Sequence, residues 1–351
     1  VGSVAVALDT WEYPINSNQD IAKIIPANVC PFYLAAFLAS SFGQTQVDRL
    51  PVGSVQQHIF LWMIERISIP RFSTVLEEKV GSLAKAAYER HEKVGQFLNQ
   101  ADGKLLEALG LAHWTPSEPL SYCARASDSI AAGRLDAQHF RPLFAEVEQH
   151  LSATGSTIEL GSILEVNSRG RQPIYADQGL PVVNSKHVRT NKVLLSHNNR
   201  QGAEFRSPVV IRKGDVLLNG TGVGTIGRAA AYMHEQRALP DNHVTVLRTS
   251  YVDPIYLSVF LNSSLGQLQM ERHIKGSSGQ IELYPNDIAT ILLWDAPDKV
   301  QAEVRDAVLS AFEQERRADE LFEAAKHIVE IAIEDGEAAA LAFLDETERA
   351  S

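Results

Sequence analysis

Two polar segments of this 351-residue chain carry side chains that suit an anionic ligand. Residues 184–192 hold three cations and two amides, and residues 275–280 are rich in glycine and serine. Lysine and arginine bind phosphate, whereas asparagine, glutamine, arginine and serine also hydrogen-bond to base edges. Either segment alone has a simpler interpretation as a solvated loop, but their joint presence favours a binding role.

A glycine-rich motif lies between these segments. Gly222-Val223-Gly224-Thr225-Ile226-Gly227 matches the GxGxxG pattern of dinucleotide-binding loops. That pattern works only where it opens a helix whose N-terminus meets the phosphates. The continuation Arg228–Tyr232 is short and soon reaches Pro240, so we expect a glycine-rich hairpin instead.

A second motif resembles a catalytic signature. Asp253-Pro254-Ile255-Tyr256 is similar to the Asp-Pro-Pro-Tyr sequence of amino-methyltransferases, but it lacks the second proline. A related segment, Cys30-Pro31-Phe32-Tyr33, does not keep the acid. Proline in the first turn of a helix explains both segments, so neither predicts catalysis.

No other pattern predicts chemistry. The eleven histidines form no HxH or HExxH pair, and no Ser/His/Asp or Cys/His signature is present. The two cysteines are too few for a disulfide framework or a zinc site, and they fit a reducing cytoplasm. We therefore expect no catalytic residues, no metal site and a cytoplasmic protein without a signal peptide.

Charge is unevenly distributed along the chain. The net charge is −11, yet residues 161–290 hold 14 Lys and Arg against 10 Asp and Glu, while residues 295–351 hold 6 against 16. Salt screens charges beyond about 10 Å, so the local field decides whether phosphate can bind. A mildly basic middle segment is compatible with nucleic acid, although so small an excess is also ordinary. The longest apolar run, Phe32–Phe42, is too short to span a bilayer.

An internal repeat organises the chain. Residues 31–44 and 254–267 are identical at nine of fourteen positions, and matches continue through Gln57 and Gln280. A repeat of this length predicts one structural unit used twice. Val1–Val4 also resembles Val223–Ile226, so we expect the chain to start partway into its first unit and to derive from a longer protein.

A long helix is predicted after each copy. Apolar residues alternate at steps of three and four over Thr74–Leu109 and about Asp298–Glu334, interrupted at Arg90 and Gln314. Each helix is about 50 Å long at 1.5 Å per residue. Two such apolar stripes favour an antiparallel coiled coil, the alternative being that each helix packs on its own domain.

Between the helices the pattern is that of an α+β module. Asp136–Ser152 predicts an amphipathic helix, and Pro254–His273 predicts the helix of the repeat. Short strands are expected at Ile163–Val166, Leu180–Val183, Val193–Leu195, Val209–Ile211, Asp215–Leu218 and His243–Leu247.

The chain resembles the specificity subunits of type I restriction-modification systems, a family that serves phage defence. The resemblance lies in a series of segments in this order: Gly133–Ala137, Gly179–Val183, Lys213-Gly214-Asp215-Val216-Leu217-Leu218, Gly224–Gly227, Leu257–Ser263 and Gly276-Ser277-Ser278-Gly279-Gln280. It implies an α+β fold in which two target-recognition domains are joined by two long conserved helices.

The resemblance divides the chain into five parts. They are the C-terminal part of a first target-recognition domain (1–72), a central conserved helix (73–112), a second target-recognition domain (113–296), a distal conserved helix (297–336) and a frayed acidic tail (337–351). The first domain departs from the family pattern because its N-terminal part is missing.

The family implies sequence-specific binding of double-stranded DNA at a split site, without catalysis. The helices would set the spacing and carry the DNA methyltransferase (modification) subunits, and the restriction/translocase subunit would join through the complex. The chain would need no cofactor, because S-adenosylmethionine, ATP and Mg would belong to those partners. No membrane partner is implied.

The expected DNA-binding residues come from the two polar segments and their neighbours. They are Asn184, Lys186, His187, Arg189, Lys192, Arg228, Arg272, Lys275, Ser277, Ser278 and Gln280. The cations would contact phosphate or guanine, and the amides and serines would lie at base edges. Two other interpretations stay open: the recognition region of a fused type II-like methyltransferase-nuclease, or a protein-interaction scaffold without a DNA role.

Overall fold

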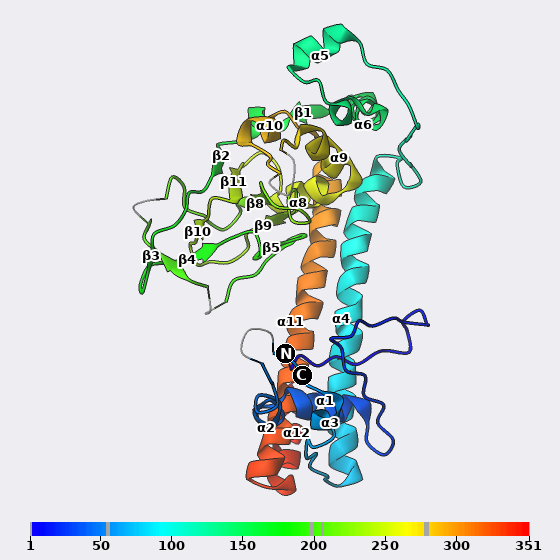
Figure 1. Cartoon of the computed structure of the whole chain (residues 1–351), viewed down its shortest axis with the longest axis vertical. Coiled ribbons are helices and arrows are strands. Elements are labelled where there is room, and N and C mark those ends of the chain that lie inside the picture. The colour runs from blue at the N-terminus through cyan, green and yellow to red at the C-terminus, as the bar shows by residue number, and fades with distance from the viewer. Residues whose placement is uncertain (1, 54–56, 197–198, 205–206, 277–280, 351) are drawn as a thin grey trace. The chain divides into compact units, whose positions relative to one another are not determined.

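The computed structural model describes residues 2–53, 57–196, 199–204, 207–276 and 281–350. These residues form two compact units (Figure 1). Unit 1 comprises residues 1–96 and 310–351, and unit 2 comprises residues 97–309. Each of the two longest helices contributes to both units. In the described part of the chain, no helix is long and apolar enough to cross a membrane.

Unit 1 is helical. Its elements are α1 (Pro31–Ala39), α2 (Ser41–Val47), α3 (Leu61–Ile64), the first part of α4 (Thr74–Ala108), the last part of α11 (Asp298–Glu334) and α12 (Glu337–Ala350). The core joins Tyr33 and Phe37 of α1 to Leu76 of α4 and Ile328 of α11. Apolar burial between α1 and the helix pair therefore holds this unit together.

The helix pair confirms the prediction for α4 and α11. In unit 1, Arg90 contacts Gln314, while the earlier residue Leu76 lies in the same core cluster as the later residue Ile328. Partner numbers rise as α4 numbers fall, so the helices are antiparallel. In unit 2 the same helices are linked by an ion pair between Lys104 and Glu303.

The prediction of a frayed tail at 337–351 was wrong. Glu337–Ala350 forms α12, and Ala340 and Leu344 are completely buried in the core of unit 1. Glu337 accepts hydrogen bonds from Ser73 at the start of α4. An alanine-rich acidic sequence suggests a solvated segment, but its apolar side can pack on another surface of the protein, and this packing stabilises the helix.

Unit 2 mixes helices and strands. Its helices are the last part of α4, α5 (Ala126–Ala132), η1 (Ala137–Phe140), α6 (Pro142–Ala153), α7 (Leu160–Ile163), α8 (Pro254–Asn262), α9 (Ser264–His273), α10 (Pro285–Ala289) and the first part of α11. Its strands are β1 (Thr157–Glu159), β2 (Val166–Arg169), β3 (Tyr175–Ala176), β4 (Leu180–Val183), β5 (Val188–Arg189), β6 (Lys192–Val193), β7 (Gln201–Gly202), β8 (Val216–Asn219), β9 (Ala229–Ala231), β10 (Leu239–Pro240), β11 (Val244–Arg248) and β12 (Leu292–Trp294).

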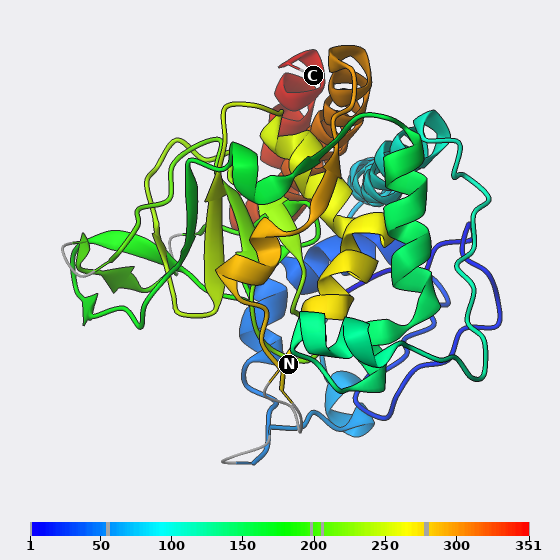
Figure 2. The same cartoon turned by 90° about the horizontal axis from the view of Figure 1, so that it is seen from above.

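The strands form two four-stranded sheets and two small ladders. One sheet has the order β2-β11-β8-β9, antiparallel throughout. The other has the order β10-β4-β7-β3, with β10 and β4 parallel. β1 pairs with β12, and β5 pairs with β6. Both views place the two four-stranded sheets on one side of α8 and α9, whereas α6 lies on the other side (Figures 1 and 2). The predicted α+β class is confirmed.

Several strand and helix predictions need correction. Leu180–Val183 is confirmed as β4, but Ile163–Val166 spans the end of α7 and the start of β2. Gly161 lets α7 pack closely on α10, because a Cβ there would lie 2.8 Å from the Cβ of Ala289. The helix expected at Asp136–Ser152 is split into η1 and α6, since the residue before Pro142 is held extended.

The repeat helix is also split, and in the same way in both copies. Ser40 and Ser263 are extended, with ψ of 165° in each, and each hydroxyl accepts the backbone N–H of the glycine three residues later. A Cβ on Gly43 or Gly266 would lie 2.2 or 2.4 Å from the carbonyl oxygen of Phe37 or Phe260. The Ser-Ser-X-Gly sequence therefore encodes a tight helix–helix corner.

Two glutamines stabilise each corner. Gln44 Nε2 donates to the carbonyls of Leu38 (2.7 Å) and Gly2 (3.1 Å). Gln267 Nε2 donates to those of Leu261 (2.7 Å) and Gly227 (3.0 Å). Gly2 therefore corresponds to Gly227, and the sequence match of Val1–Val4 with Val223–Ile226 is out of register.

The second glutamine of each copy, Gln46 or Gln269, forms hydrogen bonds with the backbone of a neighbouring segment. Gln46 exchanges two hydrogen bonds with the backbone of Ser68, at 3.0 and 2.9 Å. Gln269 exchanges two with the backbone of Leu292 in β12, at 3.0 and 2.7 Å. The repeat seen in the sequence is thus a repeat of side-chain contacts to the backbone.

Candidate nucleic-acid interface

The polar segment 184–192 folds as a tight turn followed by the β5–β6 hairpin. Asn184 Oδ1 accepts the backbone N–H of Lys186 (3.3 Å), and Asn184 O accepts that of His187 (2.8 Å). The backbone N–H of Asn184 donates to His187 Nδ1 at 3.1 Å. Burial, and then the charges of Lys186 and Arg189, lower the pKa of His187. His187 is therefore a neutral acceptor that closes the turn.

Buried asparagines fix this hairpin to the body of unit 2. Asn219, at the end of β8, is fully buried and donates from Nδ2 to the carbonyls of Ser185 (3.0 Å) and Val188 (3.3 Å). Asn191, at the hairpin tip, has φ of 59° and donates its backbone N–H to Ala229 O at 2.9 Å. Sequence reasoning did not assign these anchoring roles, although an asparagine ending the apolar run Val216–Leu218 was a usable signal.

The side chain of Asn191 completes the attachment. Its Oδ1 accepts from Asn262 Nδ2 (2.7 Å) and from Ser258 Oγ (3.3 Å), both on α8. Asparagine tolerates positive φ better than most residues, and here it also accepts from two side-chain donors on α8. The exposed side chains of Lys186 and Arg189 are consequently held on a rigid base.

Ion pairs divide the cations of unit 2 into two groups. Within residues 161–290, six cations pair with carboxylates: Arg169 with Glu282, Lys213 with Glu235, Arg237 with Glu204, Arg248 with Asp215, Arg272 with Glu148 and Lys275 with Asp287. Lys186, Arg189 and Arg228 have no carboxylate or hydrogen-bond partner for their side chains among the described residues. The same holds for Arg171 and Arg212, and Arg200 stacks on Tyr175.

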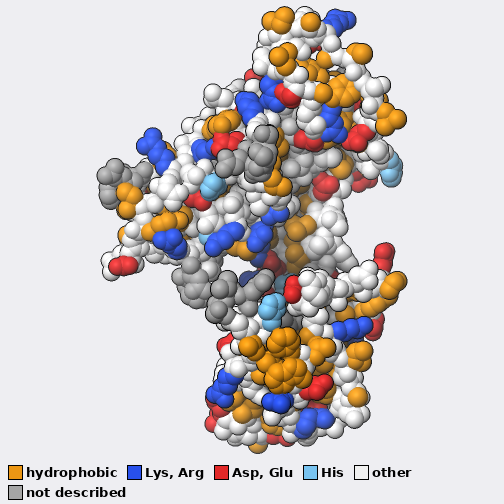
Figure 3. Space-filling model, in the orientation of Figure 1, with side chains coloured by type: hydrophobic (Ala, Val, Ile, Leu, Met, Phe, Trp, Pro, Cys, Tyr) orange, Lys and Arg blue, Asp and Glu red, His pale blue; other side chains and the backbone are white. Residues whose placement is uncertain are grey.

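The cations Lys186, Arg189 and Arg228 share one end of a sheet. The bond from Asn191 to Ala229 ties the hairpin to the residue after Arg228, and Asn219 ties the turn to the end of β8. Figure 3 shows Lys and Arg side chains gathered beside the position of β5 in Figure 1. We call Lys186, Arg189 and Arg228 the basic edge.

Arg272 and Lys275, expected to contact DNA, are engaged within the protein. Arg272 Nη1 is bonded to Glu148 of α6, and Lys275 Nζ lies 2.8 Å from Asp287 Oδ1. Lys275 also lies over the ring of Tyr284, 5.5 Å from its centre. These two positive charges are balanced locally, in contrast to those of the basic edge. Lys192 lies in β6, where its side chain is partly buried.

Ser277, Ser278 and Gln280 lie outside the described residues. The flanking residues are described: Lys275 and Glu282 form an antiparallel β-bridge. Val52 and His58 form the corresponding bridge in the first copy. The assignment of the three polar residues to base edges stays a prediction.

The glycine-rich motif forms the connection from β8 to β9. Gly222, Gly224 and Gly227 all have positive φ, and β9 follows directly. No helix begins there, so the loop lacks the helix N-terminus that a dinucleotide site needs. The expected glycine-rich hairpin is confirmed. The Asp253 motif is likewise structural, because Asp253 Oδ1 accepts the backbone N–H groups of Ile255 and Tyr256 at the start of α8.

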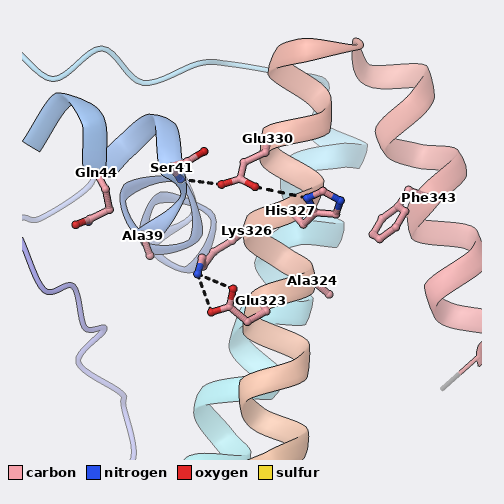
Figure 4. A pocket seen from close by; sticks show the side chains of 9 residues that line it. All are labelled: Ala39, Ser41, Gln44, Glu323, Ala324, Lys326, His327, Glu330 and Phe343. Atoms are coloured by element: carbon pink, nitrogen blue, oxygen red, sulfur yellow. Dashed lines mark hydrogen bonds and ion pairs between the residues drawn. The ribbon is translucent and has the colours of Figure 1, made fainter. Parts of the chain in front are cut away.

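Open surface pockets are present in both units. One in unit 2, of about 600 Å³, is lined by Arg134, Asp136, Gln138, Glu271, Ile274, Lys275 and Gly276. One in unit 1, of about 650 Å³, lies between α2, α11 and α12 (Figure 4). Over the described ranges, no group of three or more His, Cys, Asp or Glu side chains is arranged to hold a metal ion.

The unit 1 pocket is built around a helix cap. Glu330 accepts the backbone N–H of Ser41 at 2.7 Å, and His327 Nδ1 lies 3.5 Å from its other oxygen (Figure 4). Burial acts to raise the pKa of Glu330, but the bonds from Ser41 and His327 hold it below its usual value. Lys326 pairs with Glu323 at 2.7 Å, so these charges are balanced within the pocket.

Comparison with known proteins gives a structural likeness alone. No protein-family model and no curated protein matches the chain. The chain is similar in structure to type I restriction-modification S subunits. The S subunit from M. genitalium shows 13% identity and a TM-score of 0.35, over 90% of this chain and 72% of that one. A structure concerning complex assembly and conformational transition of the type I restriction-modification system shows 14% identity and a TM-score of 0.34, over 90% and 71%. At these values the likeness carries no conclusion about function.

Proposed function

We propose that this protein is a DNA-recognition subunit of a restriction-modification complex, without catalysis of its own. The observation that carries the proposal is the basic edge. Lys186, Arg189 and Arg228 have no acidic partner among the described residues, while two other cations of unit 2, Lys213 and Arg237, are paired with glutamates. Cations left unpaired at a rigid sheet end are suited to bind a polyanion.

The basic edge offers two kinds of contact. Lys186 is a flexible point charge that suits phosphate, and the guanidinium groups of Arg189 and Arg228 also suit the O6 and N7 acceptors of guanine. The half-buried Asn184 and the residues Ser277, Ser278 and Gln280 would supply amide and hydroxyl groups for base edges. Lys192 would add a further positive charge beside Arg189. Double-stranded DNA is the partner that combines both features.

Arg272 and Lys275 would act indirectly. Each would have to leave a carboxylate to contact phosphate, and such an exchange costs about as much as it returns. We therefore assign them to holding α9 and the hairpin after it, and we assign direct contact to the basic edge.

The antiparallel helices α4 and α11 would serve as the scaffold for DNA methyltransferase subunits. The exposed side of α11 carries acidic residues arranged in ion-pair networks, such as Glu313 with Arg316 and Arg317. An exposed charged face on a long helix suits a polar protein partner. A restriction/translocase subunit would join that complex, and S-adenosylmethionine, ATP and Mg would bind to those partners in the cytoplasm.

Binding to a mixed-sequence DNA duplex across a salt series tests the proposal. Each lost phosphate contact reduces the slope of log K against log salt by about 0.9. A Lys186→Ala, Arg189→Ala, Arg228→Ala triple variant should therefore lower the slope by roughly 2 to 3. Arg237→Ala is the matched control, because Arg237 is exposed but paired with Glu204.

The outcomes separate the competing functions. A triple variant that binds like the parent places the DNA contact elsewhere. A parent chain that shows no salt-dependent binding supports a protein-interaction scaffold. Mapping methylated sites in cells with and without the gene would then reveal a split motif, and a methyltransferase signature upstream of residue 1 would favour the fused enzyme.

A further inference from the structure

One end of the sheet β2-β11-β8-β9 carries polar side chains beyond those of the basic edge. Gly170 donates its backbone N–H to Val244 O at 2.9 Å, and Gly220 donates to His243 O at 2.8 Å. The end of β2, the start of β11 and the end of β8 therefore lie together, and β9 begins at the same end because it pairs antiparallel with β8. The side chains that follow or precede the strands here belong to Arg171, His243, Thr221 and Arg228.

This sheet end is about as wide as the major groove of DNA. Four neighbouring strands spaced about 4.8 Å apart span about 14 Å, and the groove is about 12 Å wide. Arg171 follows the edge strand β2 and Arg228 precedes the edge strand β9, so the two cations lie at opposite sides of the end. Neither has a carboxylate or hydrogen-bond partner for its side chain among the described residues. His243 and Thr221 lie between them, at the ends of the central strands.

His243 is held in place by its backbone and by its ring. Asp241 Oδ1 accepts its backbone N–H at 2.8 Å, and its ring Nδ1 lies 2.6 Å from Thr221 Oγ1. Its Nε2 has only a longer contact, 3.4 Å to Asn242 Nδ2. The residue is nevertheless exposed. An exposed ring whose orientation is fixed in advance loses little conformational entropy when it binds a ligand.

The neighbouring backbone leaves room for a ligand to approach the ring. The β8–β9 connection begins directly after Thr221, and Gly222 and Gly224 both have positive φ. Nothing lies within 4 Å of the position that a Cβ would take on Gly224, and Val223 beside it is 70% exposed. Glycines without neighbours let a ligand come close to the backbone. The glycine-rich motif thus keeps the surroundings of the histidine open.

Two carboxylates near the histidine already have partners within the protein. Glu282 forms a β-bridge with Thr221 and lies 3.5 Å from Arg169 Nη1. The bond from Tyr284, and then the charge of Arg169, hold the pKa of Glu282 below its usual value against the effect of burial. Asp241 is buried, and its carboxylate closes the turn before β11. These groups therefore leave the sheet end suited to an anionic partner.

Unit 1 forms the same turn with a different side chain. Asn18 Oδ1 accepts the backbone N–H of Asp20 at 3.1 Å, as Asp241 Oδ1 accepts that of His243. In each turn the carbonyl oxygen of the first residue also accepts the backbone N–H three residues later, at 3.3 Å in both. Asp20 precedes α1 by as many residues as His243 precedes α8. The turn therefore forms without a histidine. A side chain that selects a base is expected to differ between two copies, whereas one needed for folding is expected in both.

We propose that His243 is a specificity-determining residue that contacts a purine in the major groove of double-stranded DNA, and that Thr221 is the positioning residue for its ring. The inference rests on the proposed function and adds a base contact to it. Arg171 on one side and the basic edge on the other would bind the phosphates of the two strands.

The chemistry of the ring defines the contact. When the Thr221 hydroxyl donates to Nδ1, the hydrogen of the neutral ring lies on Nε2. Nε2 then donates a hydrogen bond, and N7 is an acceptor on both purines in the major groove. His243 would therefore distinguish a purine from a pyrimidine at one position of the site.

Selection of bound duplexes from a random-sequence pool, followed by sequencing, tests the proposal. His243→Ala should lose the purine preference at one position and keep the other preferences. Its affinity for the duplex preferred by the parent should fall by about 3- to 10-fold, the effect of one lost hydrogen bond. A 7-deazapurine at that position lacks the N7 acceptor, so it should weaken the parent by the same factor and leave His243→Ala unchanged. His113→Ala, at another exposed histidine of unit 2, is the control and should bind like the parent.

Two further changes separate positioning and phosphate contact from base contact. Thr221→Val removes the hydroxyl at nearly constant shape and should weaken the purine preference, and Thr221→Ser should restore it. Arg171→Ala should keep every base preference and lower the slope of log K against log salt by about 0.9. Thermal unfolding of each variant reports whether unit 2 stays folded.

The outcomes distinguish this proposal from the proposed function. A parent that binds DNA in a salt-dependent way but shows the same base preferences with and without His243 overturns the histidine assignment and leaves the DNA-binding role standing. Unchanged binding of the 7-deazapurine duplex by the parent also overturns it. A parent that shows no salt-dependent binding refutes both.

Discussion

Arg90 of α4 donates a hydrogen bond from Nη1 to Gln314 Oε1 of α11 at 2.9 Å, and the two residues occupy equivalent positions of the repeat. Each is the polar interruption in the apolar stripe of its own helix. Glu77 and Gln301 have the same separation in the chain and occupy the same place near the helix starts. The two interruptions are thus one contact, which fixes the register of the antiparallel pair.

Removing one partner of this contact should cost more than removing both. Arg90→Ala or Gln314→Ala alone leaves a half-buried polar group without its partner and should lower stability by about 1–2 kcal/mol. Arg90→Leu with Gln314→Leu should recover most of that loss through apolar packing. Urea unfolding followed by circular dichroism measures the free energy of unfolding of each variant. A double variant that loses as much stability as the two single variants together, or more, would contradict the prediction.

Asp102 on α4 should destabilise the protein at neutral pH. Burial raises its pKa, so the protonated form is favoured in the folded state. The contribution of the protonated carboxyl to folding stability is complete below the pKa of the unfolded chain, about 4. It is lost as the pH rises through the pKa of Asp102 in the folded state. Asp102→Asn should raise the melting temperature at pH 7 and leave it unchanged near pH 3. The exposed Asp128→Asn is the control.

His273 should make unit 2 sensitive to acid. Burial, opposed by Asp287 and assisted by Arg272, lowers its pKa to about 4. The neutral ring therefore contributes stability that is complete above the unfolded pKa of about 6.5 and is lost as pH falls towards 4. His273→Gln should flatten this part of the stability profile. Thermal unfolding between pH 7 and pH 4 would show equal slopes for parent and variant if the prediction is wrong.

The helix corner at Ser263 should not tolerate a side chain at Gly266. The new Cβ would lie 2.4 Å from the Phe260 carbonyl oxygen, so Gly266→Ala should cost about 2–4 kcal/mol through backbone displacement. Gly103→Ala is the opposite case, because nothing lies within 4 Å of the new Cβ on α4. It should raise stability by about 0.5–1 kcal/mol. If both substitutions changed the free energy of chemical unfolding equally, the close contact at the helix corner would be disproved.

The hairpin tip should influence DNA binding without carrying charge. Asn191→Gly keeps the positive φ but removes the bonds to Ser258 and Asn262. The basic edge would be less rigid, so DNA affinity should fall by about 2- to 10-fold, since ordering costs about 1 kcal/mol. Titration by fluorescence anisotropy at fixed salt measures this, and the salt slope should stay that of the parent.

The long helices were predictable because their apolar spacing is regular over many turns. Thr74–Ala108 and Asp298–Glu334 lie within a residue of the predicted ranges. The corner at Ser263 was not predictable, since it depends on a glycine that packs against the preceding turn. The helix α12 was missed for a related reason, because burial of Ala340 and Leu344 depends on a distant surface.

The candidate site divides in the same way. Composition identified the cations of 184–192, but which cations are free depends on partners far along the chain. Arg272 forms an ion pair with Glu148, which lies 124 residues away in the chain, and no local sequence pattern predicts that pair. Asn219 and Asn191 matter through backbone carbonyls of the hairpin, which become neighbours only after the sheet forms.

Unit 1 is made from two stretches of chain that enclose all of unit 2 in the sequence. On the ribosome, residues 97–309 have therefore emerged before the partner half of the α4–α11 pair is synthesised. Translation adds about 5–20 residues per second, so the first 96 residues wait on the order of ten seconds or more for their partner. During that interval the apolar faces of α1 and α4 have no native cover from α11 and α12, and the order of synthesis makes unit 1 the natural client of a chaperone.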